Sequence, residues 1–208
     1  MIPVKILAMR QIPNAAPALR QGLGAPVGYP SLGLITSDCD DATYIALDAA
    51  TKAADVRVCY ARSFYAGALN ATTPNAGEVL GILAGTNPET LKSGMEAAVS
   101  ALERVGFEDV GVPCLAHTVS SVGSFLAEEA GVRPGTALAY LIAPPLEAMY
   151  ALDGALKAAD VRLCKLYRPP SETNFGGALL SGTQSACDAA CRTFREKVQE
   201  VAMRPGGN

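Results

Sequence analysis

An octet of the sequence occurs twice, as KAADVRVC at residues 52–59 and as KAADVRLC at residues 157–164. The two octets differ at one position and lie about half of the 208-residue chain apart. The similarity extends in both directions, because YIALDAATKAAD matches MYALDGALKAAD and VLGILAGT parallels GGALLSGT. Solenoid proteins repeat every roughly 20–50 residues, a shorter period than this one. The duplication therefore predicts two tandem domains, covering residues 1–108 and 109–208.

Both repeats show the same order of strand and helix signals. Residues 4–9 and 112–118 are apolar stretches typical of strands, and a second apolar stretch follows at residues 32–35 and 138–142. Apolar residues then recur at helical spacing up to each octet, and they alternate within it as in a strand. A fourth strand that ends in a glycine and a last helix complete each repeat. The predicted fold class is α+β, with four strands and two helices in each domain.

Composition and charge exclude several classes of protein. Seventeen basic and twenty acidic residues give a net charge of −3, and no basic patch or nucleic-acid motif is visible. The apolar runs are shorter than the ~18 residues of a membrane span, and the N-terminus lacks the features of a signal peptide. Six cysteines without CxxC spacing fit a reducing cytoplasm. We therefore expect a soluble intracellular protein that binds neither nucleic acid nor membrane.

The sequence contains few of the motifs that enzymes use for catalysis. It has one histidine, and it lacks a phosphate-binding glycine loop, a nucleophile elbow and a strong metal-ligand spacing. We therefore predict a protein without catalytic activity, cofactor or metal. Two other classes stay open at this point: an enzyme that uses a carboxylate pair, and a small-molecule binding or sensing module. Assembly into sheets would separate a structural protein from both.

The order of motifs resembles a known family. A strand LGLI, a helix that ends in Lys-Ala-Ala-Asp-Val, a β-ribbon, a glycine-terminated strand and an alanine-rich helix resemble the bacterial microcompartment shell domain. Tandem domains, each preceded by a strand that single-domain members carry late, resemble the circularly permuted branch of this family. The resemblance spans residues 4–203 and is densest over residues 139–191, which are similar to shell proteins of the ethanolamine-utilisation microcompartment.

The resemblance implies a fold, a function and partners. Each domain would be a roughly four-stranded antiparallel sheet with flanking helices. The chain would be a structural shell protein that closes as a homotrimer and forms a pseudohexameric tile, because shell domains tile in sixes and each chain supplies two. The tile would have a gated central pore and three small pores. Its expected partners are other shell proteins and ethanolamine or similar small metabolites.

The octet lysines are the first candidate site. By resemblance, Lys52 and Lys157 occupy the position that mediates contact between tiles. The alternative is a solvated lysine near a helix C-terminus, where the helix dipole favours a positive charge. Asp48 and Asp153 would then be the i,i+4 partners of the two lysines.

The segments after the octets are the second candidate. By resemblance, the loops at residues 60–75 and 167–180 line the central pore, and Tyr65 and Phe175 would obstruct it. Glycine permits backbone conformations that other residues resist, as a rearranging loop requires. The loop glycines are these: Gly67, Gly176 and Gly177. The alternative is a pair of ordinary hairpin loops with aromatic anchors.

An acidic cluster is the third candidate. By resemblance, Asp40, Glu78 and Phe107 line the small pores, where two carboxylates beside an aromatic ring would suit the ammonium group of ethanolamine. The alternative is a helix cap, in which Ser37 or Asp38 accepts a hydrogen bond from the first turn.

The cysteines predict packing more strongly than metal binding. Cys187 and Cys191 have the i,i+4 spacing of half a zinc site, and His117 could be a third ligand. Leu91 and Met95 fill the same two positions in the first repeat, which favours a buried apolar stripe.

Overall fold

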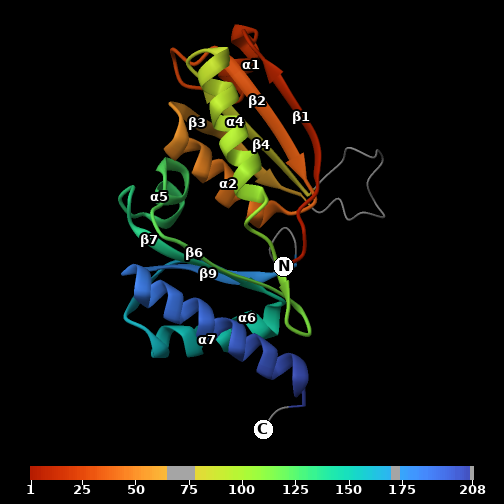
Figure 1. The fold of residues 1–208 in the computed structure, drawn as a ribbon, viewed down its shortest axis with the longest axis vertical. Coiled ribbons are helices and arrows are strands. Elements are labelled where there is room, and N and C mark those ends of the chain that lie inside the picture. The colour runs from red at the N-terminus through yellow and green to blue at the C-terminus, as the bar shows by residue number, and fades with distance from the viewer. Residues whose placement is uncertain (65–77, 170–173, 207–208) are drawn as a thin grey trace. The chain divides into compact units, whose positions relative to one another are not determined.

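A computed structural model of the chain describes residues 1–64, 78–169 and 174–206 (Figure 1). It divides into two compact units. The N-terminal unit comprises residues 3–106 together with residues 123–126. The C-terminal unit comprises residues 1–2, 107–122 and the chain from residue 127 onward. Each unit is described by itself below.

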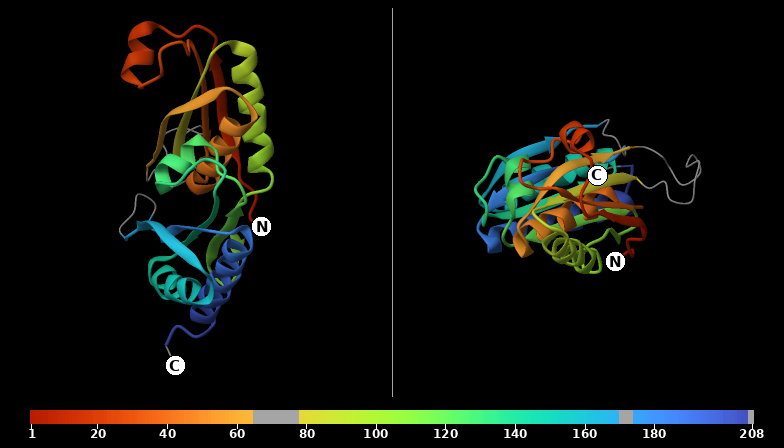
Figure 2. Two further views of the ribbon diagram at one scale, coloured as in Figure 1. Left: turned by 90° about the vertical axis from the view of Figure 1, so that its left-hand side faces the viewer. Right: turned by 90° about the horizontal axis from the view of Figure 1, so that it is seen from above.

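The N-terminal unit is a four-stranded antiparallel sheet with helices on both faces. The strand order is β1-β2-β4-β3. The strands are β1 (Ile6–Ile12), β2 (Ser31–Ser37), β3 (Val56–Ser63) and β4 (Val79–Gly85). The helices are α1 (Pro17–Gly22), α2 (Asp40–Ala53) and α4 (Pro88–Leu102). Figure 2 shows that α1 and α4 lie on opposite sides of this sheet.

Alternating residues of the central strands separate the two faces of this sheet. Leu32 and Ile82 belong to a cluster with residues of the segment between β1 and β2, which includes α1. The positions between them face the long helices, because a Cβ at Gly81 would meet Leu47 of α2 and a Cβ at Gly33 would meet Met95 of α4. The two-residue alternation of a strand thus places two cores on one sheet.

The C-terminal unit repeats this plan with an added short strand. The strand order is β5-β6-β7-β9-β8, again antiparallel. The strands are β5 (Glu108–Asp109), β6 (Pro113–Val119), β7 (Ala137–Ala143), β8 (Val161–Tyr167) and β9 (Gly176–Gly182). The helices are α5 (Ser124–Ala130), whose first three residues belong to the N-terminal unit, α6 (Pro145–Ala158) and α7 (Gln184–Met203).

The long helices form where their sequences predict them. Their apolar stripes are buried, as for Leu91 and Met95 in α4 and for Cys187 and Phe194 in α7. Both last helices have a side-chain cap: Asn87 accepts from the N–H of Thr90 at 2.9 Å, and Thr183 accepts from the N–H of Ala186 at 3.2 Å. None of the helices within the described ranges is long and apolar enough to cross a membrane. The predicted α+β class with two antiparallel sheets and flanking helices is confirmed.

The repeated octet has the same conformation in both units. Its lysine and the alanine after it are the last two residues of α2 or α6, and its remaining residues lead into β3 or β8, each of which is an edge strand. In both strands the pairing register shifts at the octet cysteine, Cys59 or Cys164. Such bulges are common in edge strands, where they bend the strand and interrupt the row of free backbone groups. The octet thus encodes a helix end and a bulged edge strand.

The predicted bounds of the two loops are wrong at their described ends. Strand β3 extends through Ser63, so Tyr60 belongs to a ladder in which it pairs with Ile82. Gly176 and Gly177 begin β9 rather than lying in a loop. A Cβ at Gly177 would lie 1.9 Å from the carbonyl oxygen of Leu141 on β7. Glycine is therefore required there for the close approach of two strands, and not for freedom of the backbone.

Candidate functional sites: an acidic cluster and two lysines

The acidic cluster lies where β2 turns into α2. Cys39 is the N-cap residue of α2 and makes no side-chain capping bond. The hydroxyl of Ser37 instead accepts from the N–H of Cys39 at 3.1 Å and lies 2.7 Å from the Thr43 hydroxyl. Asp38 accepts from the backbone N–H of Lys5 at 2.8 Å. The alternative that Ser37 or Asp38 is the N-cap of this helix is therefore wrong, and Asp38 ties β1 to the end of β2.

Asp40 and Glu78 lie near each other in the N-terminal unit. Asp40 is buried in the first turn of α2, where its Oδ1 accepts from the N–H of Asp41 at 2.9 Å. Glu78 directly precedes β4, and its N–H donates to the carbonyl of Ser37 at 2.8 Å. Burial raises the pKa of the Glu78 carboxyl, and the negative charges of Asp40 and Asp38 raise it further. Two carboxylates thus share a half-buried site that a cation would stabilise.

Phe107, the third predicted small-pore residue, lies in the C-terminal unit. Its carbonyl accepts from the N–H of Ile2 at 2.6 Å. Its ring contacts the ring of Phe175, with centroids 5.6 Å apart and planes at 32°. The sequence assigned these two rings to different pores, and their contact could not be predicted from residues so far apart in the chain.

The predicted central-pore loops are described only at their ends. Tyr65 and Gly67 lie outside the described residues. The N–H of Phe64 donates to the carbonyl of Glu78 at 3.0 Å, so one acidic residue closes the base of the first loop. The hydroxyls of Tyr44 on α2 and Ser63 on β3 are also hydrogen-bonded to each other. At the second loop, Asn174 has a left-handed backbone with φ of 64° just before Phe175.

The two octet lysines have different surroundings. Lys157 pairs with Asp153 at 2.7 Å, and the two side chains are 74% and 65% exposed. Lys52 pairs with Asp48 at 3.5 Å, but the Asp48 side chain is completely buried while that of Lys52 is 37% exposed. The predicted i,i+4 pairs are therefore confirmed in both repeats. Only the second has the open surroundings that the sequence suggests for both.

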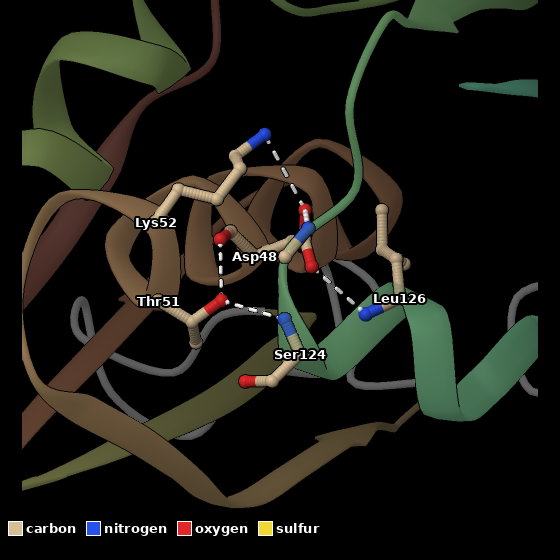
Figure 3. A network of polar contacts seen from close by, with 6 residues as sticks. Asp48, Thr51, Lys52, Ser124 and Leu126 are labelled. Atoms are coloured by element: carbon tan, nitrogen blue, oxygen red, sulfur yellow. Dashed lines mark hydrogen bonds and ion pairs between the residues drawn. The ribbon is translucent and has the colours of Figure 1, made fainter. Parts of the chain in front are cut away.

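Asp48 is buried because it holds a distant segment against α2 (Figure 3). It accepts from the N–H of Gly123 at 2.7 Å and from the N–H of Leu126 at 2.9 Å. The neighbouring Thr51 hydroxyl accepts from the N–H of Ser124 at 3.1 Å. A Cβ at Gly123 would lie 2.2 Å from the Thr51 hydroxyl oxygen, so only glycine fits there. Sequence reasoning missed this network, since Asp48 and Asp153 occupy matching positions in the two repeats.

The cysteines of α7 lie in the core of the C-terminal unit. Cys187 and Cys191 are both buried. The Thr118 hydroxyl donates to the Cys191 sulfur at 3.5 Å, and burial raises the pKa of this thiol to about 11. Across the part of the chain that the structure describes, no group of three histidine, cysteine or acidic side chains is placed to hold a metal ion.

Comparison with known proteins identifies the family. The family model of the BMC domain matches residues 31–112. The chain is 55% identical to the bacterial microcompartment shell protein EutL of Clostridium perfringens, covering 100% of this chain and 98% of that protein. It belongs to the EutL family of bacterial microcompartment shell proteins. The EutL protein of Salmonella typhimurium is 45% identical, with 99% of this chain and 96% of that protein covered.

A solved structure of the EutL family agrees with the fold. The ethanolamine utilization protein EutL of Leptotrichia buccalis is 53% identical and superimposes with a TM-score of 0.97, covering 100% of this chain and 98% of that one. The likeness thus extends through both units. This EutL-family chain is a structural shell protein of the ethanolamine-utilisation type of bacterial microcompartment, and its location is the microcompartment shell. The resemblance drawn from the octets and their flanking motifs is confirmed.

Proposed function

We propose that the chain forms a homotrimeric, pseudohexameric tile whose pores pass small metabolites, and that it assembles with other shell proteins. One observation carries this proposal: a single α+β plan is written twice, and full-length EutL relatives match the chain through both units. A chain with two equivalent domains completes a sixfold tile when three chains close around an axis. The tile is a scaffold with holes, and we propose no catalytic role for any residue.

The trimer is tested directly by the mass of the protein in solution. We expect sedimentation velocity at micromolar concentration to show a single species with three times the mass of the 21.4 kDa chain. Electron microscopy at higher concentration should show two-dimensional sheets with hexagonal repeats. A chain that stays monomeric or dimeric under these conditions would contradict the proposed function.

We propose further that Asp40 and Glu78 bind the ammonium group of ethanolamine on its way through the small pore. The support is the half-buried carboxylate pair, in which burial raises the pKa of Glu78 and the negative charges of Asp40 and Asp38 raise it further. An ammonium group between them would form charge-assisted hydrogen bonds. Weak binding suits a conduit, and a millimolar affinity corresponds to only ~4 kcal/mol.

Neutralising both carboxylates should therefore remove most of the binding. The change is Asp40→Asn with Glu78→Gln, which keeps size, and we expect at least about a tenfold weaker ethanolamine affinity, or ~1.4 kcal/mol, by NMR titration. Glu89→Gln with Glu103→Gln is the control, because both are exposed acids on or beside α4 in the same unit. Equal binding by the neutralised and control variants would show that the cluster has only a structural role.

The pH dependence has a defined sign. Because the pKa of Glu78 is raised, this carboxyl gains its proton at a higher pH than an ordinary glutamate. Ethanolamine affinity should therefore begin to fall above the usual glutamate range as the pH is lowered. The same shift means that the folded state disfavours the charged form, so Glu78→Gln should leave the free energy of unfolding at neutral pH unchanged or higher.

A further inference from the structure

The two units bury their first long helix to different extents. In α2, Asp48 is completely buried, and its neighbours Tyr44 and Thr51 on the same face are half-buried. The counterparts of these residues in α6 are all exposed. They are Met149, Asp153 and Leu156, of which the two apolar residues are each 36% exposed. One face of α6 therefore lacks the cover that the same face of α2 possesses within the described chain.

The cover of α2 is the segment at residues 123–126. It donates three backbone N–H groups to Asp48 and Thr51, as described above. It also places the Phe125 ring against the Tyr44 ring, with centroids 6.1 Å apart. The segment is buried or half-buried throughout. This contact within the N-terminal unit shows what fits on that face of a shell-domain helix.

The open face of α6 continues onto its neighbouring strand. Leu163 and Leu166 of β8 are 41% and 40% exposed. They pair with Leu180 and Ala178 of β9, which belong to the core under α6, so they lie on the same side of the sheet as that helix. We call this set the α6 surface. It consists of the following residues: Met149, Asp153, Leu156, Leu163 and Leu166.

The chain also contains an uncovered counterpart of the covering segment. Helix α1 follows β1 after a connection of the same length as the one between β6 and α5. Residues 16–19, at the start of α1, therefore correspond to residues 123–126. All four are exposed, whereas the residues of the second repeat are buried or half-buried.

One hydrogen-bond donor and its acceptor both differ between the repeats. In the N-terminal unit the N–H of Ser124 donates to the Thr51 hydroxyl. The counterpart of Ser124 is Pro17, which has no N–H, and the counterpart of Thr51 is Leu156, which has no acceptor. The donor and its acceptor are thus lost as a pair. A buried polar group without a partner is costly, so a contact between these two sites explains why both are absent.

The second acceptor, the aspartate, is kept in the second repeat, and the segment at residues 16–19 keeps the matching backbone donors. Asp153 matches Asp48, and Ala16 and Leu19 match Gly123 and Leu126, whose N–H groups Asp48 binds. Ala16 has a Cβ where glycine is required in the other repeat, so we expect a slightly wider contact at that end.

We propose that residues 16–19 of one subunit cover the α6 surface of the neighbouring subunit. This proposal rests on the trimeric tile of the proposed function and places its subunit contact. The same contact would then occur six times around the tile, three times within chains and three times between them. Such a head-to-tail contact closes into a ring when the rotation permits.

A cysteine cross-link tests this contact. Ala18→Cys combined with Met149→Cys replaces the counterparts of Phe125 and Tyr44. We expect mild oxidation to join the subunits into covalent dimers and trimers on a non-reducing gel. Each single variant and the wild-type chain should stay monomeric on that gel, which accounts for the six native cysteines.

A charge on the α6 surface provides a second test. Leu156→Glu should weaken the trimer, raising its dissociation constant by at least about tenfold. Sedimentation velocity should then show smaller species, while the circular dichroism spectrum stays unchanged. Met203→Glu is the control, because Met203 is 72% exposed in the same unit but outside the α6 surface. If the wild-type chain is trimeric but neither test responds, this contact is wrong and the tile stands. A monomeric wild-type chain would overturn both proposals.

Discussion

Asp48→Ala should lower the free energy of unfolding by about 3 kcal/mol, because it removes the acceptor of two buried backbone N–H groups. Each buried polar group left without a partner costs about 1–3 kcal/mol. The ion pair with Lys52 adds little to this sum, since the lysine is 37% exposed. Asp48→Asn keeps one acceptor oxygen and should have a smaller effect. Urea unfolding at a fixed protein concentration measures both changes.

The second repeat supplies the matched control. Asp153→Ala removes the same side chain from an exposed pair, which is worth ~0–1 kcal/mol in the isolated chain. Its remaining effect should fall on subunit association, and should therefore depend on protein concentration. The Asp48 effect should persist on dilution. Equal, concentration-independent losses in the two variants would contradict the role given to the segment at residues 123–126.

This pair of aspartates also shows which contacts could be predicted from the sequence and which could not. Both lie four residues before an octet lysine, and the i,i+4 ion pairs follow from that spacing alone. The burial of Asp48 depends on backbone groups about 75 residues away in the chain, whose conformation no local pattern reveals. Gly123 was an available signal, because glycine is common where the backbone makes a close approach.

The long elements were predictable because their sequences repeat with the period of their structure. Apolar residues recur along α4 and α7 and alternate at the start of the octet strands β3 and β8, and both patterns occur twice in the chain. The short elements escaped prediction. Helix α1 buries no residue, and β5 has only two residues, so neither has a periodicity to detect.

The candidate sites were predictable in part. The acidic cluster was recognised from composition and resemblance, and the structure places Asp40 near Glu78. The glycines at the start of β9 were misread as loop residues, because glycine signals both a flexible backbone and a close approach. Distinguishing the two requires the neighbouring strand, which supplies the carbonyl that would clash with a side chain at Gly177.

We propose that the octet lysines, Lys52 and Lys157, mediate contact between tiles at the tile edge, and their surroundings decide how this tile-edge role is tested. A glutamate at position 52 would lie beside the buried carboxylate of Asp48, so its effect on folding would obscure an effect on assembly. A glutamate at position 157 would lie beside Asp153, which is 65% exposed. Like charges at i,i+4 on an exposed helix face cost only a few tenths of a kcal/mol. Lys157 is therefore the better position for a charge reversal.

Lys157→Glu should abolish two-dimensional sheets while the trimer persists, because the proposed contact between tiles needs the lysine and its charge. Sheets are scored by negative-stain electron microscopy and trimers by sedimentation velocity. Lys92→Glu makes the same charge change at an exposed position of α4 and should still form sheets. Lys157→Arg keeps the charge and should retain at least part of the assembly.

Wild-type sheets from Lys157→Glu would refute the tile-edge role. Loss of the trimer would instead place Lys157 in the subunit contact, next to Leu156.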